Sequence, residues 1–108
     1  MTDFKRIGPD DAARLLERGA NVVDIRDEQS FASGHIPSAT RLDNTNLPQY
    51  LAATDHSKPL VVCCYHGNSS QSAAAYLASA GFAEVYSLDG GFELWHRHHP
   101  EQYERDDD

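Results

Sequence analysis

A strand, a short polar loop and a helix follow one another between residues 60 and 78, and this order limits the folds open to the chain. Residues 60–63 are apolar and rich in β-branched side chains, which is typical of a strand buried in a sheet. A loop containing Gly67 follows, and the alanine-rich residues 70–78 predict a helix. Such a junction places Cys64 at the carboxyl end of a strand, where the crevices of open α/β sheets lie.

Strand and helix patterns alternate in the same way along the whole chain. Strands are expected over residues 4–7, 21–25, a brief part of 36–42, 60–63 and 84–88. Helices are expected over residues 9–18, 27–32, 47–53, 70–78 and 92–97. Asn44 or Thr45 is expected to cap the third of these helices. The alternation predicts an α/β fold with a parallel or mostly parallel sheet and helices on both faces.

The size and charge of the chain narrow its organisation and its partners. Its 108 residues suit one domain, so residues 1–108 are expected to form a single domain, with a frayed acidic tail from Pro100 onward. The 17 acidic and 9 basic residues leave a net charge of −8. A chain so acidic is not expected to bind nucleic acid or an anionic membrane surface.

Hydropathy and cysteine content indicate the compartment. No long apolar run predicts a membrane span, and the first residues contain no apolar signal region, so a cytoplasmic location is expected. Cys63 and Cys64 are the only cysteines, and a bridge between adjacent residues would need a strained ring. Both are therefore expected to be free thiols.

The loop after Cys64 favours a negative charge. Gly67 and Asn68 tolerate left-handed conformations that turn successive N–H groups inward, so the loop amides are expected to converge on one point. The positive end of the next helix dipole adds to this field. A thiolate at Cys64 should therefore have a depressed pKa and act as a nucleophile at neutral pH. Cys63 faces the other side of the strand and is expected to be structural.

Three motifs stand out along the chain. They are residues 23–26 with Phe31 and residues 34–37, then residues 64–70 (Cys-Tyr-His-Gly-Asn-Ser-Ser), and residues 89–95 (Asp-Gly-Gly-Phe-Glu-Leu-Trp). Together they resemble the rhodanese family of sulfurtransferases over nearly the full length. The resemblance is nearest to the small single-domain thiosulfate sulfurtransferases of bacterial glycerol-phosphate operons. Ser30 and Ser38 depart from the broader family pattern, in which Glu and Gly are common, but neither touches the expected chemistry.

The resemblance implies both a fold and a reaction. The fold is a rhodanese-like three-layer α/β structure, with a five-stranded parallel sheet and helices on both faces. The reaction is thiosulfate:cyanide sulfur transfer without a cofactor: Cys64 takes the outer sulfur of thiosulfate as a persulfide, releases sulfite, and passes the sulfur to cyanide or to a cellular dithiol such as thioredoxin. The family's persulfide is cradled by main-chain amides of a loop that here comprises Cys64, Tyr65, His66, Gly67, Asn68 and Ser69.

Two other functions are alternatives to this one. A cysteine-dependent phosphatase or arsenate reductase is disfavoured because it needs an arginine six positions after the cysteine to bind the oxyanion, and Ser70 stands there. A sulfur-relay or partner-binding module that receives its sulfur from a protein persulfide stays open.

Residues in and around the loop are expected to have supporting roles. His66 either offers positive charge to the substrate sulfonate or is a neutral surface histidine, and as the only basic side chain of the loop it predicts weak thiosulfate binding. Ser70 is expected to cap the helix. Asp24 and Arg26 are expected to form a structural ion pair rather than act in catalysis.

Two further groups of side chains complete the expectations. Trp95 is expected in the core, with lining of the pocket as its alternative role. The histidines at 96, 98 and 99 do not share one face of a helix, so no metal site is expected there.

Overall fold

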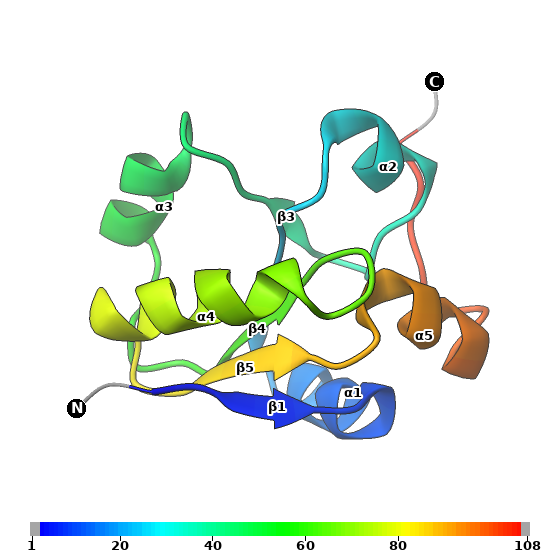
Figure 1. Ribbon diagram of the computed structural model, residues 1–108, viewed down its shortest axis with the longest axis horizontal. Helices are drawn as coiled ribbons and strands as arrows, with labels where there is room; N and C mark the ends of the chain where they lie inside the picture. The colour runs from blue at the N-terminus through cyan, green and yellow to red at the C-terminus, as the bar shows by residue number, and fades with distance from the viewer. Residues whose placement is uncertain (1–2, 107–108) are drawn as a thin grey trace.

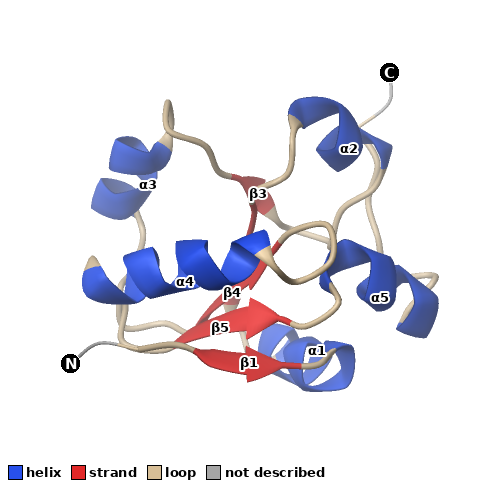
Figure 2. Ribbon diagram, viewed as in Figure 1, coloured by secondary structure: helices blue, strands red, loops and turns tan. Residues whose placement is uncertain are grey.

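The computed structural model describes residues 3–106, and a five-stranded parallel sheet forms its centre (Figures 1 and 2). The strands run in the order β1-β5-β4-β2-β3, and each neighbouring pair is parallel. Their bounds are β1 Lys5–Ile7, β2 Asn21–Asp24, β3 Thr40–Arg41, β4 Leu60–Cys63 and β5 Val85–Leu88. Because β4 lies in the middle of the sheet, the chain leaves the centre of the sheet's carboxyl edge at Cys64.

Helices cover both faces of this sheet. Their bounds are α1 Pro9–Glu17, α2 Glu28–Ser33, α3 Leu47–Ala53, α4 Ser69–Ser79 and α5 Gly91–His98. Figure 1 shows α3 and α4 on one face, α1 and α5 on the other, and α2 beyond the carboxyl end of the sheet. This three-layer α/β arrangement confirms the predicted fold. Within residues 3–106, no helix combines the length and apolar character that crossing a membrane requires.

Side chains of the central strand alternate between two apolar layers, as the strand period of two requires. Val62 packs beneath α4 with Leu77. Val61 and Cys63 face the other way and pack with Trp95 of α5. The prediction that Cys63 faces the other side of the strand from Cys64 is therefore confirmed, because the Cys63 side chain packs on the face away from α4.

The bounds of β4 and α3 match the prediction, and apart from β3 every other end differs from it by at most one residue. The strand expected within 36–42 is only Thr40–Arg41, because it pairs with β2 alone at the edge of the sheet. The cap predicted for α3 is wrong. Asn46 is the cap position and its side chain does not bond to the helix, whereas Asp43 accepts hydrogen bonds from the amides of Thr45 and Asn46.

The expectation of a frayed end from Pro100 is wrong for residues 100–106. Glu104 and His35 exchange two backbone hydrogen bonds, of 2.9 and 2.8 Å, and the Asp106 amide donates to the Ala32 carbonyl at 2.8 Å. The indole N–H of Trp95 also donates to the Gln102 carbonyl at 2.7 Å. Acidic composition suggested solvent exposure, but these backbone contacts hold the segment, and the Glu104 carboxylate also accepts from the Ser38 amide at 3.1 Å. Residues 107 and 108 lie outside the described part.

Candidate active site

The loop between β4 and α4 wraps around the sulfur of Cys64. The backbone N–H groups of Gly67 and Ser70 each donate to Cys64 Sγ at 3.2 Å. The whole residue is only 2 % exposed, so the sulfur lies on the floor of the loop. The predicted convergence of backbone dipoles on one point is therefore present, and the point is the thiol itself.

Glycine at position 67 is required by a close approach of two loops. Its φ is +92°, and a Cβ there would lie 2.6 Å from the backbone nitrogen of Gly90. The expectation for Asn68 is wrong, because Asn68 has φ −91° and ψ −57°, which is right-handed helical geometry. The inward turn of the amides thus depends on Gly67 alone, and Ser69 already begins α4.

The two neighbouring thiols have opposite pKa shifts. Burial raises the pKa of the Cys64 thiol, but hydrogen bonds from the Ser70 hydroxyl and from the amides of Ser70, Gly67 and His66 outweigh burial, and the net pKa is lowered. Burial, together with the charge of Asp24, raises the pKa of Cys63 well above its usual range. Both thiols are free. Of the two thiols, Cys64 is therefore the one that ionises more readily.

Ser70 is directed into the core and is not the cap of the helix. Because α4 begins at Ser69, Ser70 lies inside the first turn, where its side chain is fully buried. Its hydroxyl lies 2.7 Å from the hydroxyl of Ser87 on β5, and its backbone amide is the group that donates to Cys64 Sγ. Sequence reasoning missed Ser87, although a serine inside an otherwise apolar strand was the available signal.

Tyr65 ties the loop to the start of α2. Its hydroxyl donates to the carboxylate of Asp27, and the Asp27 amide is 3.3 Å from the same phenol oxygen. Asp27 also caps α2 by accepting from the Ser30 amide at 3.1 Å. The bonds from Tyr65 and then Ser30 hold the pKa of Asp27 well below its usual range. Asp27 is the second site residue that sequence reasoning missed.

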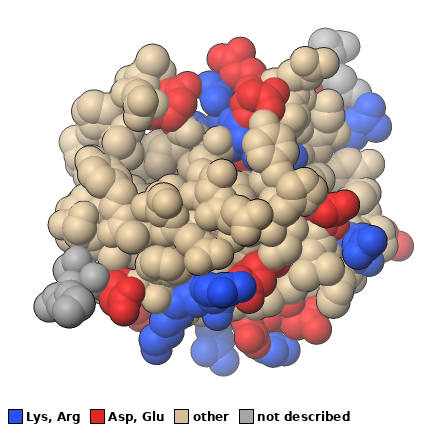
Figure 3. Space-filling model, in the orientation of Figure 1, with Lys and Arg blue, Asp and Glu red and all other residues tan. Residues whose placement is uncertain are grey.

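His66 faces a carboxylate of α5. Its Nδ1 lies 2.8 Å from Glu93 Oε1, and both side chains are largely exposed. The Glu93 carboxylate therefore offsets any positive charge on His66. Figure 3 shows no Lys, Arg, Asp or Glu on the part of this face over α4, and residues 60–83 contain none. The anion-favouring groups at the thiol are thus backbone and hydroxyl dipoles.

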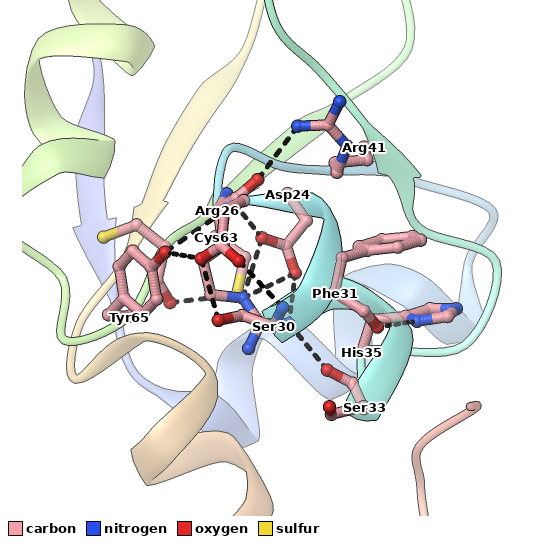
Figure 4. A network of polar contacts seen from close by, with 12 residues as sticks. Asp24, Arg26, Ser30, Phe31, Ser33, His35, Arg41, Cys63 and Tyr65 are labelled. Atoms are coloured by element: carbon pink, nitrogen blue, oxygen red, sulfur yellow. Dashed lines mark hydrogen bonds and ion pairs between the residues drawn. The ribbon is translucent and has the colours of Figure 1, made fainter. Parts of the chain in front are cut away.

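Asp24 and Arg26 form the predicted structural pair at the end of β2 (Figure 4). Arg26 Nη2 lies 2.7 Å from Asp24 Oδ2 and 2.6 Å from the Gly34 carbonyl oxygen. The exposed fractions of the two side chains are 6 % and 0 %. Burial acts to lower the pKa of Arg26, but the hydrogen bond and charge of Asp24 raise it overall. The pair therefore joins β2 to the turn after α2 as a fixed charge pair.

The remaining sequence candidates lie elsewhere. Trp95 of α5 is 1 % exposed and packs in the apolar layer with Ala12 of α1 and Cys63, so its expected place in the core is confirmed. Among the residues that the structure describes, no group of three His, Cys, Asp or Glu side chains is close enough to hold a metal ion.

Comparison with known proteins shows the family to which this fold belongs. The family model for the rhodanese-like domain matches residues 8–98, and the chain belongs to that family. It is 59% identical over 107 residues to the thiosulfate sulfurtransferase GlpE of Stutzerimonas stutzeri, covering 99% of this chain and 98% of that protein. It is 60% identical over 101 residues to the protein of the same name from Pseudomonas aeruginosa strain LESB58, covering 93% and 92%.

Solved structures show the same fold at lower identity. The Alr3790 protein from Anabaena sp. superposes with a TM-score of 0.80 at 23% identity, over 92% of this chain and 81% of that one. A rhodanese-like domain protein from Staphylococcus aureus gives a TM-score of 0.77 at 24% identity, over 94% and 98%. These two likenesses concern the fold alone.

Proposed function

We propose that this chain is a thiosulfate sulfurtransferase in which Cys64 carries the transferred sulfur. The observation that supports this most is the pair of backbone amides that donate to Cys64 Sγ at 3.2 Å, since the same amides would stabilise a thiolate and then a persulfide. The proteins of similar sequence that are named thiosulfate sulfurtransferases support the choice of substrate.

The reaction proceeds by double displacement. The Cys64 thiolate attacks the outer sulfur of thiosulfate, a new S–S bond forms, and the bond between the two thiosulfate sulfurs breaks. The bonding pair leaves with sulfite, and Cys64 is left as a persulfide anion. Cyanide then attacks the outer persulfide sulfur, forms thiocyanate, and returns the thiolate. No proton, electron or cofactor is needed from outside.

The loop supplies positioning and charge stabilisation. The Gly67 and Ser70 amides remain directed at the sulfur in each state, while Tyr65 fixes the loop against α2. A cellular dithiol of the thioredoxin type would serve in place of cyanide, because its thiolate attacks the same outer sulfur. Free thiols at both cysteines fit a reducing compartment, and we place the protein in the cytoplasm as one catalytic domain.

Steady-state turnover of thiosulfate and cyanide tests the proposal. We expect thiocyanate and sulfite in equal amounts, complete loss of turnover in Cys64→Ser, and retained turnover in Cys63→Ala as the matched control. Turnover that survives Cys64→Ser would overturn the role of Cys64. Absence of turnover in the native chain, with sulfur uptake from a persulfide-bearing protein, would instead favour the sulfur-relay function.

A further inference from the structure

Gln71 reaches back from the first turn of α4 to the Cys64 loop. Its side-chain Nε2 donates to the Gly67 carbonyl oxygen at 3.0 Å. A carbonyl oxygen only accepts, so the NH₂ group of the Gln71 side chain is the end that makes this bond. Gly67 is buried, and no backbone N–H within residues 3–106 donates to its carbonyl. A buried carbonyl without a partner destabilises a protein, so Gln71 supplies a bond that the loop requires.

Gly67 also carries one of the two amides directed at the sulfur. Its N–H donates to Cys64 Sγ at 3.2 Å, and the Ser70 N–H donates at the same distance. The two amides are held differently, because Ser70 lies within α4 whereas Gly67 precedes the helix and has φ +92°. Glycine has more backbone freedom than any other residue, so contacts from other residues must hold the Gly67 amide in place.

Two contacts act on Gly67, and they oppose different motions. The backbone at Gly90 lies against the position that a Cβ of Gly67 would take, and it blocks movement of the loop in that direction. The Gln71 bond opposes rotation of the peptide group that follows Gly67, because that rotation would carry the carbonyl away from Nε2. Since Gln71 and Ser70 are neighbours on α4, the bond also joins Gly67 to the helical turn that holds the Ser70 amide.

We propose that Gln71 is a positioning residue for Cys64, and that its side-chain amide fixes the Gly67 turn so that the Gly67 N–H stays directed at the sulfur. The inference deepens the proposed function and rests on it only for the effect on turnover. Without the Gln71 bond, the Gly67 N–H should spend part of its time turned away from Cys64 Sγ. The thiolate then loses a charge-assisted hydrogen bond, and such bonds are about twice as strong as neutral ones.

The pH dependence of Cys64 alkylation by iodoacetamide tests this inference, with the modified residue identified by peptide mass spectrometry. Gln71→Met keeps the length and the helix propensity of the side chain but removes the donor. It should raise the apparent pKa of Cys64 and slow alkylation at neutral pH by about twofold to fivefold, the size expected for one weakened hydrogen bond. The rate should recover at alkaline pH. Gln49 is exposed on α3, so Gln49→Met is the matched control and should leave the profile unchanged.

Two further measurements show whether Gln71 acts through Gly67. Gln71→Lys restores a donor of similar reach, and it should keep the native profile at high salt, where its added charge is screened. Amide hydrogen exchange followed by NMR should be faster at the Gly67 N–H in Gln71→Met and little changed at the Ser70 N–H. The inference would be overturned by an unchanged profile in Gln71→Met, by an equal shift in Gln71→Lys, or by a shifted profile with unchanged exchange at Gly67.

A second variant without a donor, Gln71→Leu, covers the case in which Gln71→Met folds poorly, and it should shift the profile in the same direction. Urea denaturation shows which variants fold. If the native chain fails to turn over thiosulfate while the alkylation profile shifts as described, the proposed function fails and the role of Gln71 stands. If the native chain turns over thiosulfate and neither variant shifts the profile, the role of Gln71 fails and the proposed function stands.

Discussion

Cys63 and Cys64 are adjacent in sequence and yet lie in different chemical environments. Cys63 is the last residue of β4 and faces the apolar layer below α1 and α5, with its thiol beside Asp24. Cys64 begins the loop, where two backbone amides donate to the sulfur. The difference arises from the strand period and from the chain's departure from the sheet, so it is predictable from sequence.

The buried pair of Asp24 and Arg26 gives a prediction on stability. Arg26→Met should lower the free energy of unfolding by about 3–5 kcal/mol, because it leaves the Asp24 carboxylate buried without its partner. Urea denaturation measures the change. The double variant Asp24→Asn with Arg26→Met should cost less than the single one. A single variant as stable as the double would contradict the assigned role of the pair.

The contact between His66 and Glu93 gives a prediction on substrate binding. Glu93→Gln removes a negative charge that lies 2.8 Å from the only basic side chain of the loop. The KM for thiosulfate should fall by about twofold to threefold with little change in kcat, and the effect should shrink as salt is added. Glu17→Gln is the control, since Glu17 is exposed at the end of α1 next to the start of β2. An equal fall in KM in that variant would show that net charge alone is responsible.

At the scale of elements, the active loop depends on the packing of two turns against each other. Gly67 lies against the turn at Gly90, so the loop after β4 and the start of α5 restrict each other's conformation. Backbone bonds add to this contact, since the Phe92 amide donates to the Cys64 carbonyl at 2.8 Å. The position of the amides that donate to Cys64 Sγ therefore depends on three elements, β4, α4 and α5.

Two glycine substitutions distinguish the cost of a left-handed backbone conformation from the effect of the close contact between Gly67 and Gly90. Gly67→Ala should reduce turnover by roughly tenfold to a hundredfold, because its Cβ would displace the loop amides from the sulfur. Gly19 has a similar φ of +96°, but nothing lies within 4 Å of the position of its Cβ. Gly19→Ala should therefore cost only about 1 kcal/mol of stability and leave turnover intact, as enzyme assays and urea denaturation would show. Equal losses of turnover in both variants would contradict the importance of the contact.

The elements themselves were largely predictable, whereas the contacts between them were not. The spacing of apolar residues along the sequence predicted the positions of β4, α4 and the Cys64 loop correctly. The bonds of Ser70 to Ser87 and of Tyr65 to Asp27 join residues 17 and 38 positions apart, and no local pattern signals such pairs. Helix capping for Ser70 was the best local inference, but tertiary packing directed the hydroxyl inward instead.

At the scale of the whole molecule, the last described residues are bonded to α2, to the turn after it and to α5. Glu104 pairs with His35, and Gln102 accepts the Trp95 indole N–H. The aromatic ring of His35 also stacks on Phe31, at 3.8 Å between ring centroids. The acidic character of this segment concealed its structural role, because its bonds are made mostly by the backbone.

Truncation of the chain tests that role. Removal of residues 101–108 should lower the free energy of unfolding by roughly 2–4 kcal/mol, since it unpairs the backbone of His35 and the buried indole N–H. Urea unfolding followed by fluorescence is a direct measure, because Trp95 is the only tryptophan. A chain that ends at Asp106 keeps these bonds and serves as the control. Equal stability of the two truncated chains would contradict the closing role of the segment.

The most direct test of the central claim is the mass of the intact, reduced protein after incubation with thiosulfate. The account predicts a gain of one sulfur atom that maps to Cys64, is absent in Cys64→Ser, and disappears on addition of cyanide as thiocyanate forms. A protein that turns over thiosulfate without gaining sulfur, or that gains it at Cys63, would contradict the account.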